Sequence, residues 1–453
     1  MQSVNPATGR ILADYPEHGP EDIQAILAGN VLACRCWGNW SFADRGACLH
    51  KAAALLEARR SELARLISLE MGKPLAEARR EIGRCVLVCK YYADNTACLL
   101  APERPVPGPR DTQVVFDPLG PVLAIMPWNF PFWQVFRSAA PALMAGNSFL
   151  LKHAPTVTGC ALMIEDIFAS CGLPEDLFRV LVTGEAEVAG VIADARVRAV
   201  TLTGSCRAGE AVASQAGRAL KKAVLELGGS DPFIVLEDAD LDQAVATAVA
   251  ARFYNAGQTC ISAKRFLVAR GVARTFEEKL TQAVAALKVG DPMEPDTVIG
   301  PMAREDLRLA VEEQVAQAVA AGARLLLPGG RLDGPGFFFA PVVLAGVRPG
   351  MRVFEEEVFG PVASITTFSE EGDALRLANA TPYGLGASVW TANLARGRKM
   401  AGLLEAGTVA VNALVKSDPR LPFGGVKRSG FGRELGRYGL LEFVNIKTIH
   451  VGP

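Results

Sequence analysis

The spacing of apolar residues changes along the chain, and each change marks a different expected element. In the N-terminal part, apolar positions recur three and four apart, which predicts amphipathic helices over residues 21–37, 43–71 and 75–100. A Pro-rich connector over residues 101–109 cannot form helix interior and is expected to act as a spacer. Residues 112–116 then have the pattern of a strand.

The next part of the chain alternates short apolar runs with helical segments. The expected strands are residues 122–126, 148–152, 178–181, 199–202 and 223–226. This alternation is typical of a parallel sheet covered on both faces, in which ligands bind at the carboxyl ends of the strands. Lys152, the turn Thr203-Gly204-Ser205 and Glu226 all come at such ends.

A second alternating region begins near Ser230. Strands are expected at residues 233–236, 265–269, 336–344, 363–368, 386–390 and 408–412, with one more in the tail at 442–451. Helices are expected at residues 241–254, 272–287, 305–321 and 372–380. A chain of 453 residues exceeds one compact core, so the pattern predicts an α/β protein of two or three domains.

Composition narrows the possible partners. Half of the residues are hydrophobic, 21% are charged and the formal net charge is −1, which argues against a nucleic acid or an anionic membrane as partner. Residues 1–12 lack the pattern of a secretory signal, and no apolar run is long enough for a membrane-spanning helix. We therefore expect the ten cysteines to be reduced thiols in a cytoplasm.

Two cysteine pairs raise the question of a metal site. Cys34 and Cys36 lie two apart, and Cys85 and Cys89 share one face of an expected helix. The chain has four histidines, and none lies near either pair in sequence. We interpret these cysteines as buried thiols that act as small hydrophobes, and we expect no metal.

Cys260 is the candidate nucleophile. It ends the run Asn255-Ala256-Gly257-Gln258-Thr259-Cys260, where an expected helix gives way to a loop. A cysteine in a loop can meet a substrate, but it must become a thiolate, which needs backbone amides or a positive neighbour. An inert buried thiol is the alternative that this local sequence leaves open.

Glu226, Asn129 and the turn at Gly204-Ser205 complement a thiol nucleophile. Glu226 ends an apolar strand before two glycines, so that partial burial would suit it as a general base, although a capping or ion-paired Glu is the alternative. Asn129 could donate its amide to an oxyanion or merely cap a helix that Pro131 opens. Gly204 and Ser205 join a strand to a helix, where free N–H groups can hold a phosphate; an ordinary turn explains them nearly as well.

Several motifs occur together in one known order and spacing. They are Pro127-Trp128-Asn129-Phe130-Pro131, Thr203-Gly204-Ser205, Glu226-Leu227-Gly228-Gly229, Gly257-Gln258-Thr259-Cys260, Glu357-Val358-Phe359-Gly360-Pro361 and Pro422-Phe423-Gly424-Gly425. With them, the chain resembles the aldehyde dehydrogenase superfamily over nearly its whole length. The phrases Leu151-Lys152-His153-Ala154-Pro155 and Leu227-Gly228-Gly229-Ser230-Asp231-Pro232 look like a bacterial subgroup that acts on succinate semialdehyde.

The resemblance implies a three-part architecture: a Rossmann-type NAD(P)-binding domain, an α/β catalytic domain and a β-hairpin oligomerisation arm. Their expected bounds are residues 1–100 with 119–228, residues 229–428, and residues 101–118 with 440–453, respectively. The arm implies a homodimer or a homotetramer.

The resemblance also implies a role for each catalytic candidate. Cys260 would attack the aldehyde, Asn129 would hold the oxyanion, and Glu226 would activate the water that cleaves the thioester. The implied cofactor residues are Trp128, Lys152, Pro155, Gly204, Ser205, Leu227, Glu357 and Phe359. Among these, Lys152 would bind the adenosine ribose and Glu357 the nicotinamide ribose, with Phe359 beside it.

The chain departs from the family pattern at two positions, Pro155 and Ser230. NAD-preferring relatives often place a carboxylate at the position of Pro155, where it bonds the ribose 2′-hydroxyl and repels a 2′-phosphate. Its absence leaves room for NADP without excluding NAD. Ser230 stands where many relatives have Lys, and the sequence offers no account of its effect.

Arg137 is the clue to the substrate. It shares one helix face with Phe130 and Trp133, at the position where relatives acting on succinate semialdehyde carry an arginine that can hold a carboxylate. An ordinary salt bridge is the alternative. The implied substrate set is Arg137, Trp133, Ser417 and Phe423, with Lys416 and Arg420 near the same loop.

A second arginine that those relatives usually carry, six residues before the nucleophile, is absent. Tyr254 occupies its position, and the nearby Arg252 is expected to point elsewhere. Two rivals to a hydrolytic dehydrogenase remain at this stage. One is a CoA-acylating relative, which would not need the base Glu226, and the other is a non-catalytic protein of the same fold.

Overall fold

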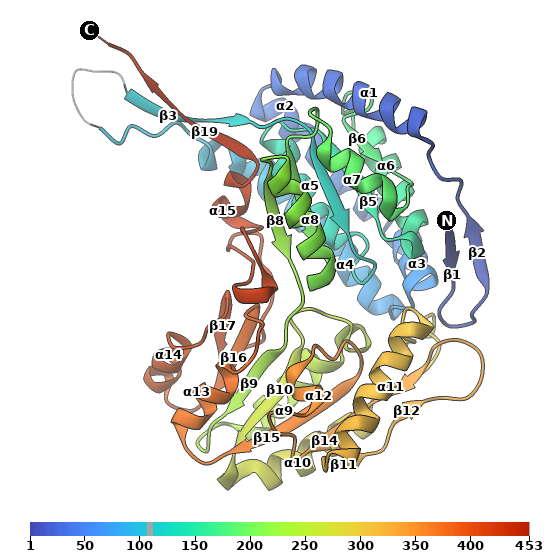
Figure 1. Cartoon of the computed structure of the whole chain (residues 1–453), viewed down its shortest axis with the longest axis vertical. Coiled ribbons are helices and arrows are strands. Elements are labelled where there is room, and N and C mark those ends of the chain that lie inside the picture. Colours follow the sequence, from blue (N-terminus) through green and yellow to red (C-terminus); the bar gives the residue numbers. More distant parts are fainter. Residues whose placement is uncertain (107–111, 453) are drawn as a thin grey trace.

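Two mainly parallel sheets organise the chain, each with helices on its faces (Figure 1). The structure is a computed structural model that describes residues 1–106 and 112–452. The first sheet has six strands in the order β18-β8-β7-β4-β5-β6, and the second has seven in the order β11-β14-β15-β10-β9-β16-β17. The two sheets form the upper and lower lobes of Figure 1.

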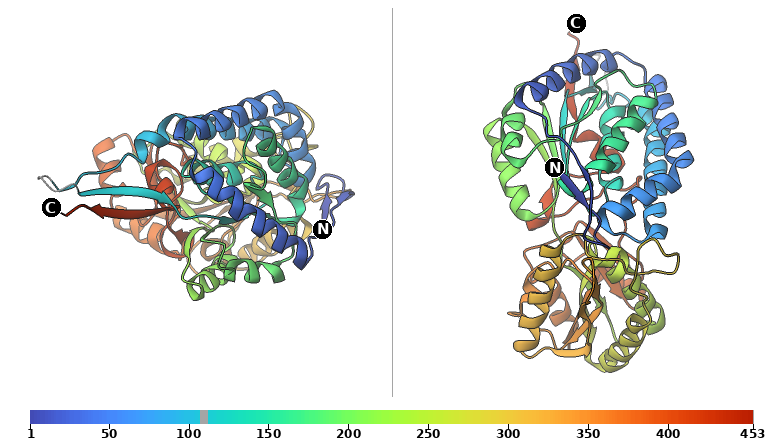
Figure 2. Two further views of the ribbon diagram at one scale, coloured as in Figure 1. Left: turned by 90° about the horizontal axis from the view of Figure 1, so that it is seen from above. Right: turned by 90° about the vertical axis from the view of Figure 1, so that its right-hand side faces the viewer.

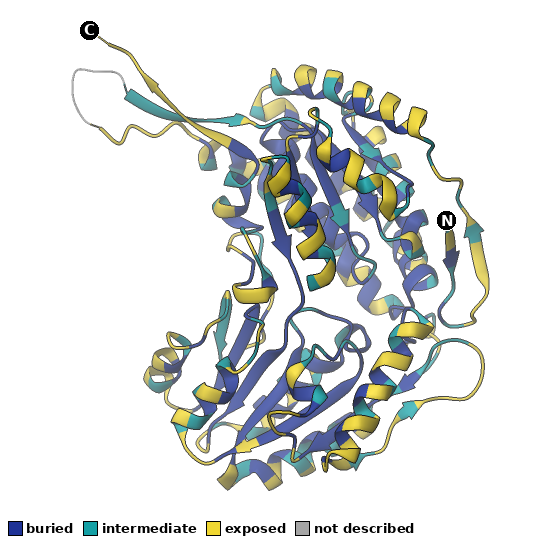
Figure 3. Cartoon of the chain, in the orientation of Figure 1, coloured by how far each residue is buried: buried dark blue, intermediate teal, exposed yellow. Residues whose placement is uncertain are grey.

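The six-stranded sheet contains the strands whose carboxyl ends lie at or beside Lys152, Gly204 and Glu226. Its parallel strands are β4 (Val122–Met126), β5 (Phe149–His153), β6 (Phe178–Val180), β7 (Ala199–Thr203) and β8 (Lys222–Glu226), and β18 (Gly430–Phe431) pairs antiparallel with β8. The helices between them are α5 (Trp133–Met144), η1 (Pro155–Val157), α6 (Thr158–Ser170), α7 (Glu185–Ala193) and α8 (Cys206–Arg218). Strands β5 and β7 are buried along their whole length, as expected for a sheet covered on both faces (Figure 3).

The N-terminal helices pack beside this sheet. They are α1 (Pro20–Gly38), α2 (Phe42–Ala58), α3 (Arg60–Met71) and α4 (Leu75–Leu99), preceded by the short hairpin of β1 (Gln2–Val4) and β2 (Ile11–Asp14). Helix α4 packs against α5, and residues of both belong to one hydrophobic core. This contact places α4 next to the turn that follows β4.

The seven-stranded sheet is also mainly parallel, with helices between its strands. Its strands are β9 (Asp231–Val235), β10 (Ala263–Ala269), β11 (Arg324–Leu327), β14 (Val342–Ala345), β15 (Val362–Phe368), β16 (Gly386–Trp390) and β17 (Thr408–Val411), of which only β11 runs antiparallel. Its helices are α9 (Leu241–Phe253), η2 (Tyr254–Gly257), α10 (Arg270–Ala285), α11 (Glu305–Ala320), α12 (Arg352–Glu355), α13 (Glu371–Asn379) and α14 (Leu394–Ala401). Strands β12 (Gly330–Arg331) and β13 (Phe339–Ala340) pair separately.

A two-stranded arm leaves the upper lobe. Strand β3 (Thr112–Pro118) pairs antiparallel with β19 (Val444–His450), in a register that runs from Thr112 opposite His450 to Pro118 opposite Val444. Figure 2 shows the two strands side by side, pointing away from the body. Residues 445–450 are all exposed (Figure 3). The remaining elements, η3 (Lys427–Ser429) and α15 (Gly436–Leu441), lie before the arm in sequence.

The fold differs from the sequence prediction at a few places. The helix expected over residues 43–71 is two helices, because Arg59 leaves helical geometry with a ψ of 11°. The strand expected over residues 336–344 is divided into β13 and β14, and the helix after Pro131 begins at Trp133. The connector expected over residues 101–109 forms no helix up to residue 106, and the rest of it lies outside the described residues.

The described residues can also be compared with what the composition indicated about membranes, metals and thiols. Within residues 1–106 and 112–452, no helix has both the length and the apolar character required to cross a membrane. No group of three or more His, Cys, Asp or Glu side chains in this part of the chain is arranged to hold a metal ion. All ten cysteines lie in it and are free thiols. Cys34, Cys85 and Cys89 are buried as expected, whereas Cys36 is exposed, so its interpretation as a buried thiol is wrong.

Candidate active site

Cys260 lies where two cavities meet. The first cavity, of about 410 Å³, is lined by residues of α4, α5, α9 and the loop after β17, and we call it the basic cavity for reasons given below. The second, of about 240 Å³, contains Gly204 and Gly228 in its wall and is called the glycine cavity. Cys260 and Gln134 line both cavities. A molecule in either cavity therefore reaches the same thiol.

The loop that carries Cys260 has an unusual backbone. Asn255, Ala256 and Gly257 are consecutive residues with positive φ, at 54°, 54° and 73°. For residues other than glycine this conformation costs about 1–3 kcal/mol each and persists only when neighbours hold it. The Asn255 N–H donates to the Glu77 carboxylate at 2.9 Å, and the Asn255 side-chain amide donates to the Asn129 carbonyl at 2.9 Å. Long-range contacts therefore fix the position of the nucleophile.

Asn129 is held on the opposite side of the same loop. Its side-chain N–H donates to the Gln258 carbonyl at 3.0 Å, and an amide has a second N–H that remains for an oxyanion. Asn129 does not cap the following helix, because the residue at the N-cap of α5 is Phe132. The helix-capping interpretation of Asn129 is therefore wrong, and its side chain points to the Cys260 loop.

A buried ion pair supports Asn129 from behind. Lys73 and Glu81 form a salt bridge with both side chains fully buried. The Lys73 ammonium also donates to the Asn129 carbonyl at 2.9 Å. The Glu81 carboxylate accepts from the N–H groups of Phe132 and Trp133, at 2.9 and 3.0 Å, and so caps α5. Sequence reasoning missed this pair, because nothing local marks these charges as buried.

Glu226 ends β8 with its carboxylate in a dry environment. Both of its oxygens are buried, and neither has a hydrogen-bond partner among the described residues. Burial raises the pKa of Glu226 above the usual carboxyl range; the charge of Arg137 opposes the rise and that of Glu434 adds to it. A Cβ on Gly424 would lie 2.7 Å from the Glu226 carboxylate, so a glycine there keeps the space open. This environment suits a base that takes a proton near neutral pH.

The Cys260 thiol is neutral at rest. Burial raises its pKa to about 12, while the positive charges of Arg137 and Lys264 act in the opposite direction. The Lys264 ammonium donates to the backbone carbonyls of Thr259 and Cys260, at 2.8 and 2.7 Å. Because the thiolate is the reactive form, attack by Cys260 requires a base that removes its proton.

The glycine cavity gathers most of the residues expected to bind a cofactor. Its lining includes Trp128, Gly204, Ser205, Leu227, Glu357 and Phe359, together with Asn129 and Cys260. The rings of Trp128 and Phe359 meet edge to face at 5.8 Å. Leu307 of α11 and Gln134 of α5 also line the cavity and were not foreseen.

Two features of the glycine cavity suit the phosphate and the ribose of a nucleotide. Ser205 caps α8, a helix of 13 residues, and both Gly204 and Ser205 line the cavity, so a phosphate beside them would lie at the start of a helix. Glu357 accepts from the Gly229 N–H at 3.1 Å and pairs with Lys264 at 3.2 Å. A Cβ on Gly228 would lie 2.2 Å from the Glu357 carboxylate, so Glu357 reaches this position only beside a glycine.

Lys152 and Pro155 lie apart from this lining. Lys152 is buried near the carboxyl end of β5, where the negative charges of Glu185 and Glu17 act on it, and Pro155 is exposed at the start of η1. Neither residue borders the glycine cavity. The position of Pro155 carries no charge, as the sequence indicated.

The basic cavity contains all four residues of the expected substrate set. Trp133, Arg137, Ser417 and Phe423 line it together with Cys260. The charged side chains in its described lining are Arg80, Arg84, Arg137 and Lys416, and all four are cations. Arg80 and Arg84 come from α4 and were missed, because the sequence pattern placed them on an ordinary polar helix face.

Arg137 has more than one partner within this wall. Its side chain is buried and forms an ion pair with Glu434, and one N–H donates to the Thr203 hydroxyl at 3.2 Å. The guanidinium also lies over the Phe423 ring, 4.9 Å from its centre. The salt bridge that the sequence left as an alternative is thus present, although Arg137 still borders the cavity. The hydrogen bond to Thr203 uses Nη2, and the closest contact with Glu434 is at Nε.

Arg252 points away from both cavities, as expected. It is buried and donates to the backbone carbonyls of Val358 and Gly360, which fixes the segment after α12. Tyr254, by contrast, lines the basic cavity and stacks on Phe130 with ring centres 5.9 Å apart. The position usually taken by a second arginine therefore faces the cavity with an uncharged ring.

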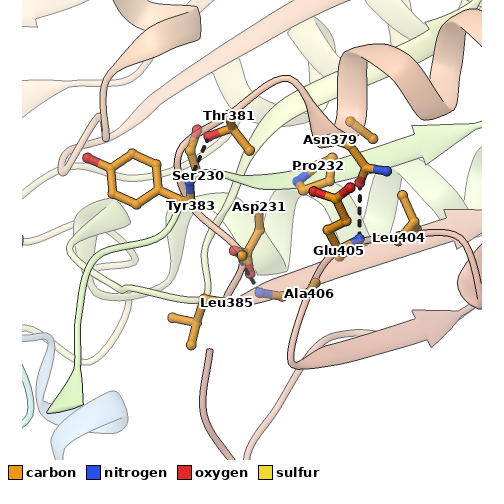
Figure 4. A pocket seen from close by; sticks show the side chains of 14 residues that line it. Ser230, Asp231, Pro232, Asn379, Thr381, Tyr383, Leu385, Leu404, Glu405 and Ala406 are labelled. Carbon is orange, nitrogen blue, oxygen red and sulfur yellow. Dashed lines mark hydrogen bonds between the residues drawn. The ribbon is translucent and has the colours of Figure 1, made fainter. Parts of the chain in front are cut away.

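Ser230 and Asp231 line a separate small hollow between β9 and the loop before β16 (Figure 4). The Asp231 carboxylate accepts from the Gly386 N–H at 3.0 Å, and burial raises its pKa to about 7. The Ser230 carbonyl accepts from the Arg265 guanidinium at 2.9 Å. Neither residue lines the basic cavity or the glycine cavity, so Ser230 has no direct contact with the candidate site.

Comparison with known proteins identifies the family of this chain. The chain matches the aldehyde dehydrogenase family over residues 1–449. It is 50% identical over 451 residues to a probable NADP(+) succinate-semialdehyde dehydrogenase of Synechocystis sp., covering 100% of this chain and 99% of that protein. It is 47% identical over 447 residues to the NAD(P)+ succinate semialdehyde dehydrogenase Sad of Escherichia coli, covering 99% of this chain and 97% of Sad.

The fold comparison gives the same result. The backbone matches the crystal structure of succinic semialdehyde dehydrogenase from Streptococcus pyogenes, solved in complex with NADP+, with a TM-score of 0.98 at 35% identity. The match covers 100% of both chains. On the length and the identity of these matches, the chain belongs to the aldehyde dehydrogenase family.

Proposed function

We propose that this protein oxidises succinate semialdehyde to succinate with NAD(P)+ as oxidant and water as acyl acceptor. The observation that carries the proposal is the charge of the basic cavity. All charged side chains in the described lining of this cavity are cations, and Cys260 is part of the same lining. A short aldehyde with a distal carboxylate complements such a cavity, whereas a neutral aldehyde gains nothing from it. The names of the relatives support the same substrate.

The proposed chemistry uses three side chains in turn. The Cys260 thiol gives its proton to solvent water as its sulfur attacks the aldehyde carbon, and the second Asn129 N–H donates to the oxyanion. NAD(P)+, when bound in the glycine cavity, supplies the hydride acceptor that turns the adduct into a thioester on Cys260. Glu226 then takes a proton from a water molecule, whose oxygen attacks the thioester carbon. Cleavage of the C–S bond releases succinate, and the thiol regains its proton.

We propose that the cofactor lies along the glycine cavity. Gly204 and Ser205 would hold the diphosphate, Glu357 the nicotinamide ribose, and Trp128, Leu227 and Phe359 the neighbouring surfaces. Lys152 at the end of β5 would reach the adenosine ribose. Because Pro155 brings no carboxylate to that region, the site accepts a 2′-phosphate, and we expect NADP+ to serve at least as well as NAD+.

The remaining substrate residues belong to the walls of the basic cavity. We propose that Trp133 and Phe423 pack on the carbon chain, and that Arg137 and Ser417 contribute charge and hydrogen bonds beside it. In this arrangement Arg137 acts on the reacting end as well, because its charge opposes the raised pKa values of Cys260 and Glu226.

The test is an absorbance assay for NAD(P)H with succinate semialdehyde and with butanal, with either cofactor, with and without CoA. The proposal predicts turnover without CoA and a higher kcat/KM for the acid. Strict dependence on CoA would favour an acylating enzyme, and failure to oxidise any aldehyde would favour a non-catalytic protein. Glu226, whose environment is that of a water-activating base, favours the hydrolytic alternative.

The division of the chain into functional parts is also a proposal. We assign residues 1–100 and 119–228 to cofactor binding, residues 229–428 to the catalytic domain, and residues 101–118 and 440–453 to an oligomerisation arm. The exposed strand β19 supports the last assignment, since it projects with Ile446 at 57% exposure (Figure 1). We propose a homodimer or a homotetramer in a cytoplasm, where ten free thiols stay reduced.

A further inference from the structure

The four cations of the basic cavity differ in what they are bound to. Arg137 is paired with Glu434, and Arg80 lies 3.9 Å from Glu77 with 64% of its side chain exposed. Lys416 is exposed to solvent. Arg84 alone is both partly buried and without an ion pair or hydrogen bond to any described residue. A guanidinium that is partly removed from water and lacks an acidic partner is a natural site for a carboxylate.

Helix α4 explains why Arg84 faces the cavity. Residues 77, 80, 81 and 84 are spaced three and four apart, so they share one face of the helix. The two acidic members of this set turn inward, Glu77 to the Asn255 N–H and Glu81 to the start of α5. These contacts fix the rotation of α4, and Arg80 and Arg84 are left to line the basic cavity.

Arg84 lies near Tyr254 in the wall of the basic cavity. The charge of Arg84 acts on the Tyr254 phenol and opposes the rise in the pKa of Tyr254 that burial causes. Both residues line the basic cavity, where Tyr254 contributes an uncharged ring. Arg84 thus brings a cation to this wall from a different element of the fold.

We propose that Arg84 is the residue that binds the distal carboxylate of the substrate, and so determines the preference for ω-oxo acids over neutral aldehydes. This inference rests on the proposed function. Arg84 offers two parallel N–H donors to the carboxylate and has no acidic partner, whereas Arg137 is already paired with Glu434. Arg137 then supplies positive charge at the reacting end, and Arg84 sets specificity at the far end.

The test compares KM and kcat for succinate semialdehyde and for butanal in Arg84→Met, Arg84→Lys and the wild type. Arg84→Met keeps an apolar stem and removes the charge, so KM for succinate semialdehyde should rise by ~10-fold or more and much more than KM for butanal. Arg84→Lys restores the charge without the fork and should recover part of the loss. Arg79→Met is the matched control, because Arg79 is exposed on the same helix outside the cavity and should leave both substrates unchanged.

The possible results distinguish a failure of this inference from a failure of the proposed function. If the wild type shows no preference for succinate semialdehyde over butanal, the proposed function itself fails. If the wild type has the preference and Arg84→Met retains it, or loses activity equally on both aldehydes, then Arg84 is not the carboxylate ligand while the proposed function stands. A thermal melt of each variant identifies loss of folding. If Arg84→Met does not fold, the ratio of KM for succinate semialdehyde to KM for butanal is compared between Arg84→Lys and the wild type, and an unchanged ratio would show that Arg84 is not the carboxylate ligand.

Discussion

The pKa of Glu226 depends on burial and on the charges of Arg137, Glu434 and Arg433. Arg137 lowers the pKa of Glu226, Glu434 raises it, and burial raises it most. The pKa of Glu434 is itself raised by burial, against the effect of Arg137. The sequence identified Glu226 and Arg137 from their motifs, but Glu434 lies far along the chain in a segment without a recognisable signal. Its influence is visible only because the fold brings it to Arg137.

The substitution Glu434→Gln should therefore move the pH dependence of turnover. Glu226 must be deprotonated to act as a base, so activity rises with pH through its pKa. Removing the negative charge of Glu434 frees Arg137 and lowers the pKa of Glu226, because a like charge is lost and the attraction of the cation remains. The rising limb of the profile of kcat against pH should shift to lower pH.

The control is Glu294→Gln, which removes an exposed carboxylate outside both cavities. This control should leave the profile in place. A shift of the Glu434→Gln profile to higher pH, or an unchanged profile in a folded enzyme, would contradict the assigned electrostatic balance.

At the scale of elements, α4 connects the two halves of the catalytic machinery. Glu77 holds the strained Cys260 loop, and Glu81 with Lys73 holds the Asn129 turn and the start of α5. The spacing of apolar residues predicted this helix almost to its ends. It did not predict that two of its acidic residues are buried, because a charged residue on a helix ordinarily faces solvent. Long-range partners, which no local pattern encodes, determine their place.

The substitution Glu81→Ala tests whether the Lys73–Glu81 pair positions Asn129 as well as stabilising the fold. It leaves the Lys73 ammonium buried without its partner, which destabilises a fold by about 3–5 kcal/mol. It also releases the turn that carries Asn129, so kcat should fall by ~10-fold or more as the oxyanion donor loses its position. The measurements are kcat, KM and the thermal midpoint.

The double variant Lys73→Met/Glu81→Leu provides the decisive comparison. Apolar residues in place of a buried pair restore much of the stability, but they cannot donate to the Asn129 carbonyl. We expect the melting temperature to recover while kcat stays low. Recovery of both would show that the pair acts on stability alone.

The whole molecule places its reacting groups at the junction of two lobes. Asn129 follows β4 and Glu226 ends β8 in the six-stranded sheet, and Cys260 precedes β10 of the seven-stranded sheet. The alternation of strands and helices was sufficient to predict both sheets and the strand ends at which Lys152, Gly204 and Glu226 lie. The exposed hairpin of β1 and β2 was missed, because its short strands carry little periodic signal.

The arm gives a prediction at this scale. Ile446 on β19 is 57% exposed and pairs with Phe116 on β3. If the arm joins subunits, Ile446→Glu should weaken the assembly, since a charge would have to be buried at the contact. Light scattering should show a smaller mass at low concentration than for the wild type.

Leu309→Glu is the matched control, because Leu309 is 47% exposed on α11, away from the arm. Its mass should equal that of the wild type. A monomeric wild type, or an Ile446→Glu variant of unchanged mass at every concentration, would show that the arm does not assemble the protein in this way.

The central claim is that Cys260 carries the acyl group and that Glu226 directs water to release it. The most direct test mixes Glu226→Gln with succinate semialdehyde and NADP+ and follows NADPH formation, together with the mass of the peptide that contains Cys260. The account predicts one rapid burst of about one NADPH per subunit, turnover slowed by ~10²-fold or more, and a succinyl group on Cys260. Normal steady turnover, or a burst without an acyl group on Cys260, would contradict it.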